Sequence, residues 1–488
     1  MKIKKYISAF AMASLLCVST SCSDFLDKDP ENSVPEKNVD FTNLSNMYQP
    51  VSGVYAKVRT GGLHWVVWPL SIVRDDDVWS GRVDDQQPLV NFGNYNYDNS
   101  FWGLNEMWNQ YYGIIKVANA ALESLDSYAA NITSAADMNT KKAYEGEVRF
   151  LRSYAYYRLV QAFGPVTILR SNSQTDLRRS TIESVYNYVL EDLQFAMDNA
   201  PKLRPNEMSH EGAVSAYSAM ALAAKIHLNM GKYDKVKALT DEIINSGKFS
   251  LYPDFYNLFK IPGKLSDESL FEVQTTDFGN GSGEMITTDN WFAFQGPAND
   301  GQISGWGFVG LYKTFRDWAK SRGETVRYQT SFLEAGTTTP SGDVIRPLQN
   351  PTQTDCWNGK AYTPANQLTP GRTDYGANNN VRVLRYADVL LMNAEATIRL
   401  GGNGDAPFNL VRTRAKMPTI TGVTIDNVLD ERRMELCCEW GERYNDLVRT
   451  GKATEVLGSK GWTAAKTYYP IPFEQLSDNP NLANEPIQ

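Results

Sequence analysis

A run of charged residues that ends in a tryptophan is one place where this 488-residue chain could contact a ligand. It reads Arg74-Asp-Asp-Asp-Val-Trp79, and three adjacent acids suit neither a helix interior nor a buried strand, so a loop is predicted. Its carboxylates could accept hydrogen bonds from sugar hydroxyls, Arg74 could donate, and the flat indole of Trp79 could stack on a pyranose. The alternatives are a solvated turn with Trp79 folded back, or a calcium site that lacks the usual spacing of oxygen ligands.

Three further tryptophans resemble Trp79 in having Asp, Asn or Gly close by in the sequence. Trp291 follows Asp-Asn, Trp306 lies between two glycines, and Trp357 precedes Asn-Gly. We expect a tryptophan in such a position, outside any helical stripe, to be exposed on a loop, although a core or loop-anchoring role is the alternative for each. The residues predicted to contact a ligand are therefore Trp79, Trp291, Trp306, Trp357, Arg74 and Asp76.

The acids could instead form a catalytic pair, such as one of Asp75–Asp77 with Glu106 or Glu284. Glycoside hydrolysis needs two carboxyl groups about 5 Å or about 6.5–9.5 Å apart, and the sequence does not bring any two together. The three histidines are scattered singly and none lies in a nucleophile motif, so neither triad chemistry nor a multi-histidine metal site is predicted. We expect no catalytic residue, no metal and no cofactor.

The overall charge excludes one large class of function. The chain has 48 Lys and Arg against 56 Asp and Glu, a net charge of −8. A protein that binds nucleic acid through bulk charge needs a basic face, so no nucleic-acid partner is expected.

The N-terminus, MKIKKYISAFAMASLLCVSTSC, is typical of an exported protein. Three lysines precede an apolar stretch of signal-peptide length that is too short to span a bilayer. Cys22 directly follows small residues, as the lipid-modified cysteine of a bacterial lipoprotein does, although Ser19 stands where the stricter pattern has leucine. We expect residues 1–21 to be a lipoprotein signal peptide and Cys22 to carry the lipid; a plain secretory peptide is the alternative.

Most of the remaining chain shows helical periodicity. Apolar stripes at three- and four-residue spacing predict helices over 42–59, 101–126, 141–163, 182–200, 381–400 and 426–450. Ser180-Thr-Ile-Glu183 resembles a capping box that opens the fourth of these. Small residues, a glycine turn and a tyrosine predict a tetratricopeptide-like pair over 213–246, and the preceding helices suggest four stacked pairs. The adjacent Cys437 and Cys438 imply no disulfide framework, although a link from one of them to Cys356 is an open alternative.

The segment from about 247 to 378 differs because it is rich in Gly, Pro, Asn and Thr, yet also in aromatic residues. We expect it to be folded surface rather than a linker, with a strand at 269–275 and a helix at 310–320. The predicted parts are residues 1–21, an N-terminal helical part over 22–246, and a loop-rich middle with C-terminal helices over 247–488. Arg149 and Arg152 are expected to pair with acids, as are Glu431, Arg432, Glu435, Arg443 and Asp446. Trp108 and Trp440 are expected in the core.

Several motifs, in this order and spacing, make the chain resemble the SusD/RagB family of lipid-anchored glycan-binding proteins. They are CSDFLDKDP at Cys22–Pro30, YYGIIKVANAAL at Tyr111–Leu122, EVRFLRSYAYYRLVQAFGPV at Glu147–Val166, VRVLRYADVLLMNAEA at Val381–Ala396, ERRMELCCEWGERYNDLVRTGK at Glu431–Lys452 and YYPIPFEQL at Tyr468–Leu476. Two segments depart from the family pattern: Glu435–Arg443, and the C-terminal end at Ala483–Gln488.

The resemblance implies a mainly α-helical fold in which tetratricopeptide-like helical pairs form a scaffold and an irregular, loop-rich part binds the ligand. It implies non-catalytic binding of an oligosaccharide or polysaccharide at the cell surface. It also implies delivery to a SusC-like TonB-dependent transporter, from a lipid anchor on the outer membrane that faces the exterior. The alternatives are another nutrient such as a peptide or glycoprotein, a glycoside hydrolase, and an all-helical adaptor that binds only protein.

Overall fold

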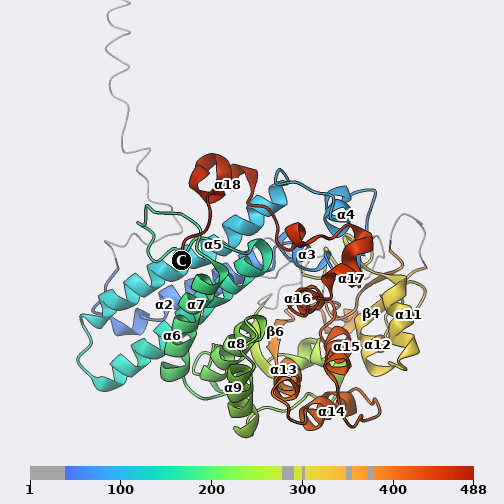
Figure 1. The fold of residues 1–488 in the computed structure, drawn as a ribbon. Helices are drawn as coiled ribbons and strands as arrows, with labels where there is room; N and C mark the ends of the chain where they lie inside the picture. Colours follow the sequence, from blue (N-terminus) through green and yellow to red (C-terminus); the bar gives the residue numbers. More distant parts are fainter. Residues whose placement is uncertain (1–38, 277–290, 299–302, 348–353, 371–377) are drawn as a thin grey trace, which may run out of the picture. The chain divides into compact units, whose positions relative to one another are not determined.

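The computed structural model describes residues 39–276, 291–298, 303–347, 354–370 and 378–488. The chain divides into two units, Met1–Asn46 and Met47–Gln488. Of the first unit only residues 39–46 are described, with a short 3-10 helix at Leu44–Asn46. The predicted signal peptide and Cys22 lie outside the described residues. Everything below concerns the second unit, labelled as in Figure 1.

The scaffold of this unit is a row of long helices (Figure 1). Each packs on the next, in the order α2, α5, α6, α7, α8, α9, α13 and α14. They can be grouped as four neighbouring pairs, as predicted, but the fourth comes from the C-terminal half of the chain. Their bounds are Gln49–Gly62 (α2), Trp102–Ala129 (α5), Ala135–Phe163 (α6), Ile182–Asn199 (α7), Ala216–Asn229 (α8), Tyr233–Asn245 (α9), Tyr386–Arg399 (α13) and Asp405–Arg414 (α14).

Local sequence signals determine where these helices begin. The hydroxyl of Ser134 accepts a hydrogen bond from the backbone of Asp137 at the start of α6, and Ser215 caps α8 in the same way. The predicted cap of α7 is wrong by one residue, because Thr181 rather than Ser180 accepts the bond from Ser184. Ser180 is instead bridged to Val166 by its backbone.

The tetratricopeptide-like pair α8 and α9 is confirmed. Its alanines are buried where the helices meet, and Gly231 at the turn has a positive φ of 67°. Thr240, which stands where an aromatic residue is usual, is fully buried in α9. Its hydroxyl accepts a hydrogen bond from Asn393 of α13 at 2.9 Å, so it ties this pair to the fourth.

The middle of the chain inserts between α9 and α13. It contains short helices and the antiparallel ladders of β2 with β6 and of β4 with β5. Its strand β3 pairs with β1, which lies between α2 and α5 in the chain. The predicted strand and helix are both present, as β2 and α11. The bounds are Val78–Ser80 (β1), Ser269–Val273 (β2), Val309–Leu311 (β3), Phe332–Glu334 (β4), Cys356–Asn358 (β5), Val381–Arg385 (β6), Phe255–Leu258 (α10), Lys313–Ser321 (α11) and Val326–Ser331 (α12).

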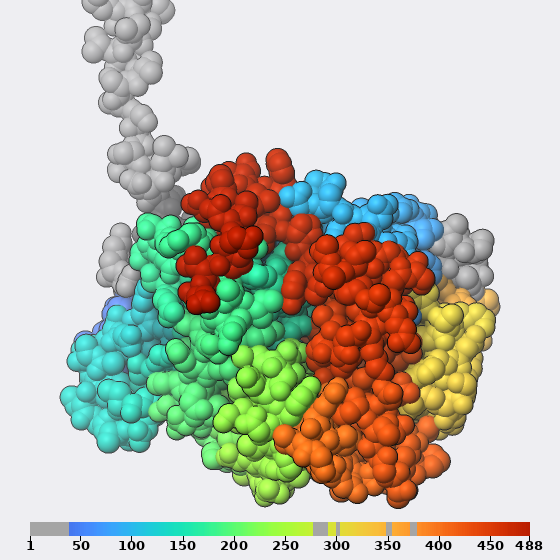
Figure 2. Space-filling view, viewed as in Figure 1, coloured from blue at the N-terminus to red at the C-terminus, as the bar shows by residue number. Residues whose placement is uncertain are grey.

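Short helices complete the unit at both ends of the chain. The C-terminal residues (dark red in Figure 2) lie on the segment just before α7, where the backbone of Ile487 bonds to Arg179 and Thr181. No helix among the described residues combines the length and apolar character needed to cross a bilayer. The remaining bounds are Val67–Ile72 (α3), Gln87–Gly93 (α4), Ile425–Glu435 (α15), Glu442–Arg449 (α16), Ala453–Leu457 (α17) and Phe473–Asp478 (α18).

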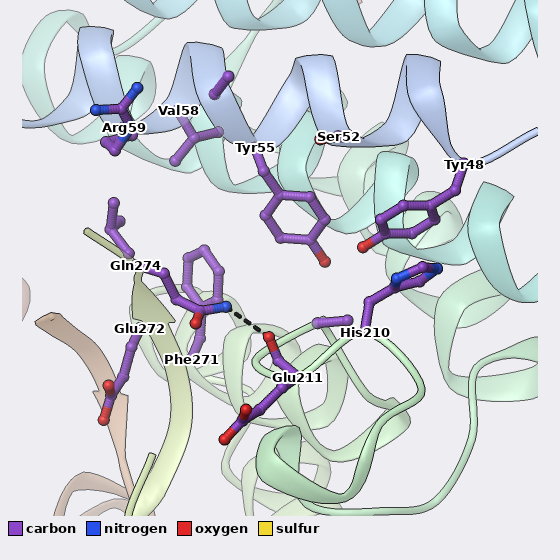
Figure 3. Close-up of a pocket in the computed structure, with 13 residues that line it drawn as sticks. Tyr48, Ser52, Tyr55, Val58, Arg59, His210, Glu211, Phe271, Glu272 and Gln274 are labelled. Atoms are coloured by element: carbon purple, nitrogen blue, oxygen red, sulfur yellow. Dashed lines mark hydrogen bonds between the residues drawn. The ribbon is translucent and has the colours of Figure 1, made fainter. Parts of the chain in front are cut away.

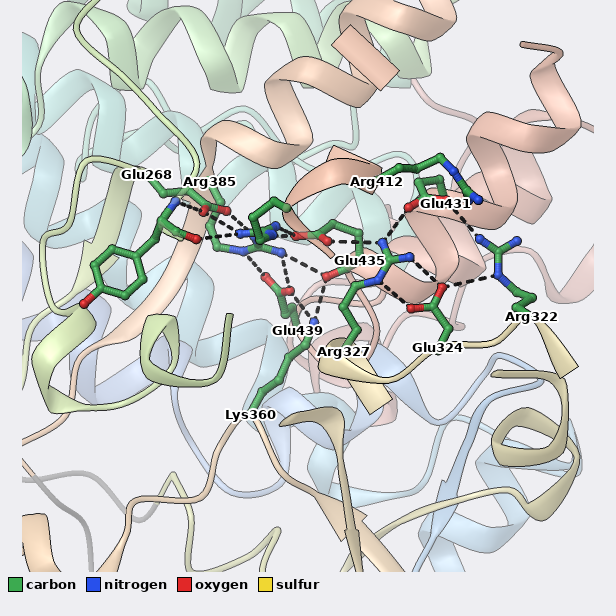
Figure 4. Close-up of polar contacts among 12 residues, drawn as sticks. Glu268, Arg322, Glu324, Arg327, Lys360, Arg385, Arg412, Glu431, Glu435 and Glu439 are labelled. Carbon is green, nitrogen blue, oxygen red and sulfur yellow. Dashed lines mark hydrogen bonds and ion pairs between the residues drawn. The ribbon is translucent and has the colours of Figure 1, made fainter. Parts of the chain in front are cut away.

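A buried layer of ion pairs joins the insertion to the C-terminal helices (Figure 4). Arg385 of β6 contacts Glu268 at 2.6 Å, Glu435 at 3.0 Å and Glu439 at 2.7 Å, and Lys360 also contacts Glu439 at 2.8 Å. Further along the layer, Arg327 bonds to Glu324 and Glu431. The sequence prediction of an ion-paired ERRMEL segment is confirmed.

The structure also tests the predictions for two arginines, two tryptophans and the cysteines. Arg149 and Arg152 of α6 pair with Asp192 of α7 at 2.8 Å each. Trp108 and Trp440 are buried, as expected. The cysteines of the described part of the chain, Cys356, Cys437 and Cys438, are buried and free, so neither alternative disulfide forms.

Candidate functional site

Three tryptophans from separate segments form a platform of indole rings, here called the tryptophan platform. The ring of Trp65 lies 5.5 Å from that of Trp102 and 6.4 Å from that of Trp306, measured between centroids. Phe308 lies beneath, 5.7 Å from Trp65 and 5.5 Å from Trp306. Trp102 is 47% exposed, and Trp65 and Trp306 are half-buried. Such a set of partly exposed rings can stack on the apolar faces of a ligand.

Close packing at Gly103 positions two of these rings, those of Trp65 and Trp102. Trp65 lies in the turn between α2 and α3, and Trp102 is the first residue of α5. At the next position, Gly103, a Cβ atom would come within 2.7 Å of the Val66 side chain. The absence of a side chain at Gly103 therefore lets the start of α5 approach the turn that carries Trp65.

The third ring is held by a ladder of backbone hydrogen bonds. The amide of Trp306 donates to Ala293 at 2.5 Å, and that of Phe308 donates to Phe294 at 2.9 Å. Gly307 between them has a φ of 71°, which glycine adopts without strain. The amide of Gly81, just after β1, donates to the Phe308 carbonyl and joins this segment to β1.

Polar side chains lie beside the platform. The His64 ring is 6.0 Å from that of Trp65, and its Nε2 is 3.8 Å from Oε1 of Glu106. The same oxygen accepts a hydrogen bond from Gln110 at 2.5 Å, and Gln110 in turn accepts one from Lys57 at 2.8 Å. Burial lowers the pKa of His64, so the imidazole is neutral at pH 7. The neutral imidazole of His64 can both donate a hydrogen bond to a ligand hydroxyl and accept one from it.

Of the residues predicted from sequence, Trp306 is the one that lies in the platform. Trp79 in β1 is half-buried and stacks on Tyr312, 6.1 Å away, opposite Gly310 of β3. Trp291 is half-buried too, with its ring 4.8 Å from that of Trp68 and stacked 5.7 Å from that of Trp440. Whether these two rings contact a ligand stays a prediction.

The expectation of exposure is wrong for two residues. Trp357 is 3% exposed, because β5 carries it into a core cluster with Leu333 and Tyr362. Arg74 is 2% exposed, and its guanidinium lies 4.1 Å and 4.2 Å from the ring centroids of Tyr444 and Tyr469. Both side chains therefore stabilise the fold where they lie.

The acidic run forms a clamp rather than an open loop of carboxylates. Asp76 accepts hydrogen bonds from Arg443 at 2.8 Å and from Arg433 at 2.9 Å, and Asp77 accepts one from Arg433 at 2.9 Å. Asp75 caps the following turn by accepting from two backbone amides at 2.8 Å. The predicted role of Asp76 as a free acceptor is therefore not supported by its contacts. Within the described residues, no three His, Cys, Asp or Glu side chains are grouped to hold a metal ion.

Sequence reasoning missed Trp65 and Trp102. Trp102 has a glycine neighbour, as Trp306 does, but the helix predicted over 101–126 includes it and so excludes it from the loop tryptophans. Trp65 lies in an apolar run between two helices, and no local signal marks it as exposed. The pairing of these two rings with Trp306 depends on contacts between distant segments.

A separate cavity of about 300 Å³ lies between α2, the 210–213 loop and β2 (Figure 3). Tyr48 stacks on His210 with ring centroids 3.4 Å apart. The hydroxyls of Tyr48 and Tyr55 both donate to the buried Glu147, at 3.1 Å and 2.7 Å. Several polar groups around this cavity thus bond to one another, which makes it a weaker candidate than the tryptophan platform.

Burial raises the pKa of Glu147 to about 7, against the lowering effect of the two tyrosine hydrogen bonds. Glu147 therefore binds a proton more tightly in the folded protein than in the unfolded chain, where its pKa is near 4.5. As the pH rises above 4.5, the unfolded chain releases this proton first, so the contribution of Glu147 to folding becomes increasingly unfavourable. We take the unfolding free energy of Glu147→Gln minus that of wild type. This difference is expected to increase by about 1–3 kcal/mol from pH 5 to pH 8.

Urea denaturation of both proteins at several pH values checks this prediction. His210, which is close by and present in both proteins, contributes alike to the two curves. An equal difference in unfolding free energy at pH 5 and pH 8 would contradict the shifted pKa.

Comparison with known proteins finds SusD-like proteins among the matches. The model described as "SusD family" matches residues 311–487, and the one described as "Starch-binding associating with outer membrane" matches residues 24–228. SusD-like protein P38 of Formosa agariphila is 26% identical to this chain over 99% of it and 98% of that protein. Along most of its length the chain is therefore similar to SusD-like proteins.

Solved structures agree in fold. Surface glycan-binding protein A from Bacteroides thetaiotaomicron, in complex with laminarihexaose, is 24% identical with a TM-score of 0.76, covering 90% of this chain and 98% of that one. A laminarin-binding SusD-like protein, also 24% identical, has a TM-score of 0.74 and covers 88% and 97%. The prediction of a mainly α-helical fold with tetratricopeptide-like pairs is confirmed.

Proposed function

We propose that this protein binds an oligosaccharide or polysaccharide at the tryptophan platform without cleaving it. The observation that carries this proposal is the convergence of Trp65, Trp102 and Trp306 from three segments, with hydrogen-bonding side chains beside them. Indole faces bury the C–H surface of a sugar ring, while His64 and Gln110 offer partners for its hydroxyls. One structural relative is in complex with laminarihexaose and another is described as laminarin-binding, which supports the same function.

The glycan is then delivered to a SusC-like TonB-dependent transporter in the outer membrane, and this protein is held there by lipid on Cys22, facing the exterior. Similarity to SusD-like proteins, the description of one matching model and the N-terminal sequence support this part of the proposal. Binding of a peptide or glycoprotein in the same role is the alternative, and a glycoside hydrolase is the alternative from another class.

A glycan array probed with the soluble form that begins at Ser23 tests the proposal. We expect retention of one family of glycans and no growth in reducing ends when the purified protein is incubated with the retained glycan. New reducing ends that Glu106→Gln abolishes would support a hydrolase. Absence of binding to every glycan, with capture of peptides instead, would overturn the proposed ligand class.

The proposed anchor makes a prediction of its own. Cys22→Ala removes the thiol that would carry the lipid, so the variant is expected to lose label from radioactive palmitate and leave the membrane fraction. Cys17→Ala is the matched control, because it removes the other N-terminal thiol and should change neither readout. Persistent labelling of the Cys22 variant would place the lipid elsewhere.

A further inference from the structure

The solvent-facing side of α5 continues away from the tryptophan platform as a polar stripe. Trp102, Asn105, Asn109 and Lys116 follow one another at steps of three, four and seven residues, so they share one side of the helix. Asn109 and Lys116 are exposed. With a rise of about 1.5 Å per residue, Asn109 lies roughly 10 Å along the helix from Trp102.

The C-terminal helix α18 lies along this stripe. The side-chain amide of Gln475 donates to Oδ1 of Asn105 at 2.8 Å and to Oδ1 of Asn109 at 3.1 Å. The backbone amide of Phe473 donates to the Asn99 carbonyl at 3.0 Å, just before α5 begins. The end of the chain therefore packs against α5 (Figure 1).

Beside this contact, a cavity of about 210 Å³ lies between α5, the 167–177 connection and the C-terminal residues. Its apolar lining includes Trp108, Tyr112 and Leu482, all buried. The Tyr112 hydroxyl is already bonded to the Thr167 carbonyl at 2.8 Å, so the ring rather than the hydroxyl is available to a ligand. Asn109, Lys116 and Asp478 are exposed at its polar edge.

This combination matches that of the platform: aromatic and apolar surface beside groups that donate and accept. A carboxamide offers both a donor and an acceptor, Lys116 only donors and Asp478 only acceptors, which together suit the hydroxyls of a sugar. Asn109 and Lys116 belong both to the stripe and to the cavity lining, so the two are continuous. A single extended ligand could contact the platform and the cavity at once.

We propose that this cavity between α5, the 167–177 connection and the C-terminal residues is a second subsite for the distal units of the same glycan. This inference rests on the proposed function, since it assigns a second contact region to the ligand of the platform. Longer oligosaccharides are then bound more tightly than short ones, because only they reach the cavity.

Calorimetric titration of wild type, Lys116→Ala and Asn109→Ala tests the subsite. The ligands are oligosaccharides of laminarin, xyloglucan and starch, each in a short and a long form. Each variant is expected to bind the long form of the recognised series roughly 2- to 10-fold more weakly, the effect of one hydrogen bond, and the short form unchanged. Lys142→Ala, an exposed lysine of α6, is the matched control. The side chain of Lys116 is exposed, so Lys116→Ala should fold normally and still tests the subsite if Asn109→Ala misfolds.

The outcomes separate the two proposals. Loss confined to long oligosaccharides supports the subsite. Equal affinities of both variants and wild type for short and long forms, with Trp102→Ala still losing binding, would overturn the subsite and leave the platform in place. If wild type binds none of these series nor any glycan on the array, the proposed function fails and the subsite with it.

Discussion

Arg385→Ala is expected to lower the free energy of unfolding by about 3–5 kcal/mol, the cost of breaking a buried ion pair by removing one partner. Arg385 is 2% exposed, and its guanidinium bonds to Glu268, Glu435 and Glu439. Alanine would leave these carboxylates buried with one cation fewer. It would also separate β6 from α15, two elements that the arginine joins.

Thermal and urea denaturation measure the effect. Arg178→Ala is the matched control, because Arg178 pairs with Asp176 at 2.6 Å on the surface, where such a pair contributes about 0–1 kcal/mol. A loss for Arg385→Ala no larger than that of Arg178→Ala would contradict a stabilising role of the buried layer. The neighbouring Lys360 and Arg414 still contact Glu439 and Glu435, so partial compensation sets the lower end of the range.

Removing any one ring of the tryptophan platform is expected to weaken glycan binding. By analogy with other ring-stacking sites, each of Trp65→Ala, Trp102→Ala and Trp306→Ala should cost about 1–3 kcal/mol, or roughly 5- to 150-fold in affinity. Trp102→Ala gives the cleanest result, since the ring is largely exposed and its loss should leave the melting temperature unchanged. Calorimetry with the glycan identified on the array measures each affinity.

Two controls bracket this prediction. Leu410→Ala removes an apolar side chain of similar exposure, 52%, from α14, outside the platform, and should bind like wild type. Trp357→Ala removes a core ring and should cost about 3–5 kcal/mol of stability. Wild-type affinity in all three platform variants would show that the glycan binds elsewhere.

Much of the fold could be predicted because helices carry their signals locally. The apolar stripes of α5, α6 and α7 and the small residues of α8 are visible in the sequence at their own positions. The origin of the fourth pair could not be predicted in this way, because α13, which packs on α9, follows it in the chain only after the whole insertion. Local periodicity reports that a face is apolar and does not identify what covers it.

The site was harder to predict for the same reason. Trp306 and Trp357 have similar neighbours in sequence, yet one lies on the platform and the other in the core. Arg74 is enclosed by Tyr444 and Tyr469, far along the chain, and nothing near Arg74 indicates this. Exposure of a loop residue depends on which distant segments pack against it.

The C-terminal origin of the fourth helical pair has a consequence for the order in which the protein folds. The indole of Trp68 donates to the Glu439 carbonyl across 371 positions, and Arg433 bonds to Asp77 across 356. The N-terminal helices therefore reach their final environment only after nearly the whole chain has emerged from the ribosome. Contacts between residues so far apart in sequence form late, so the half-made chain spends an interval with apolar faces uncovered.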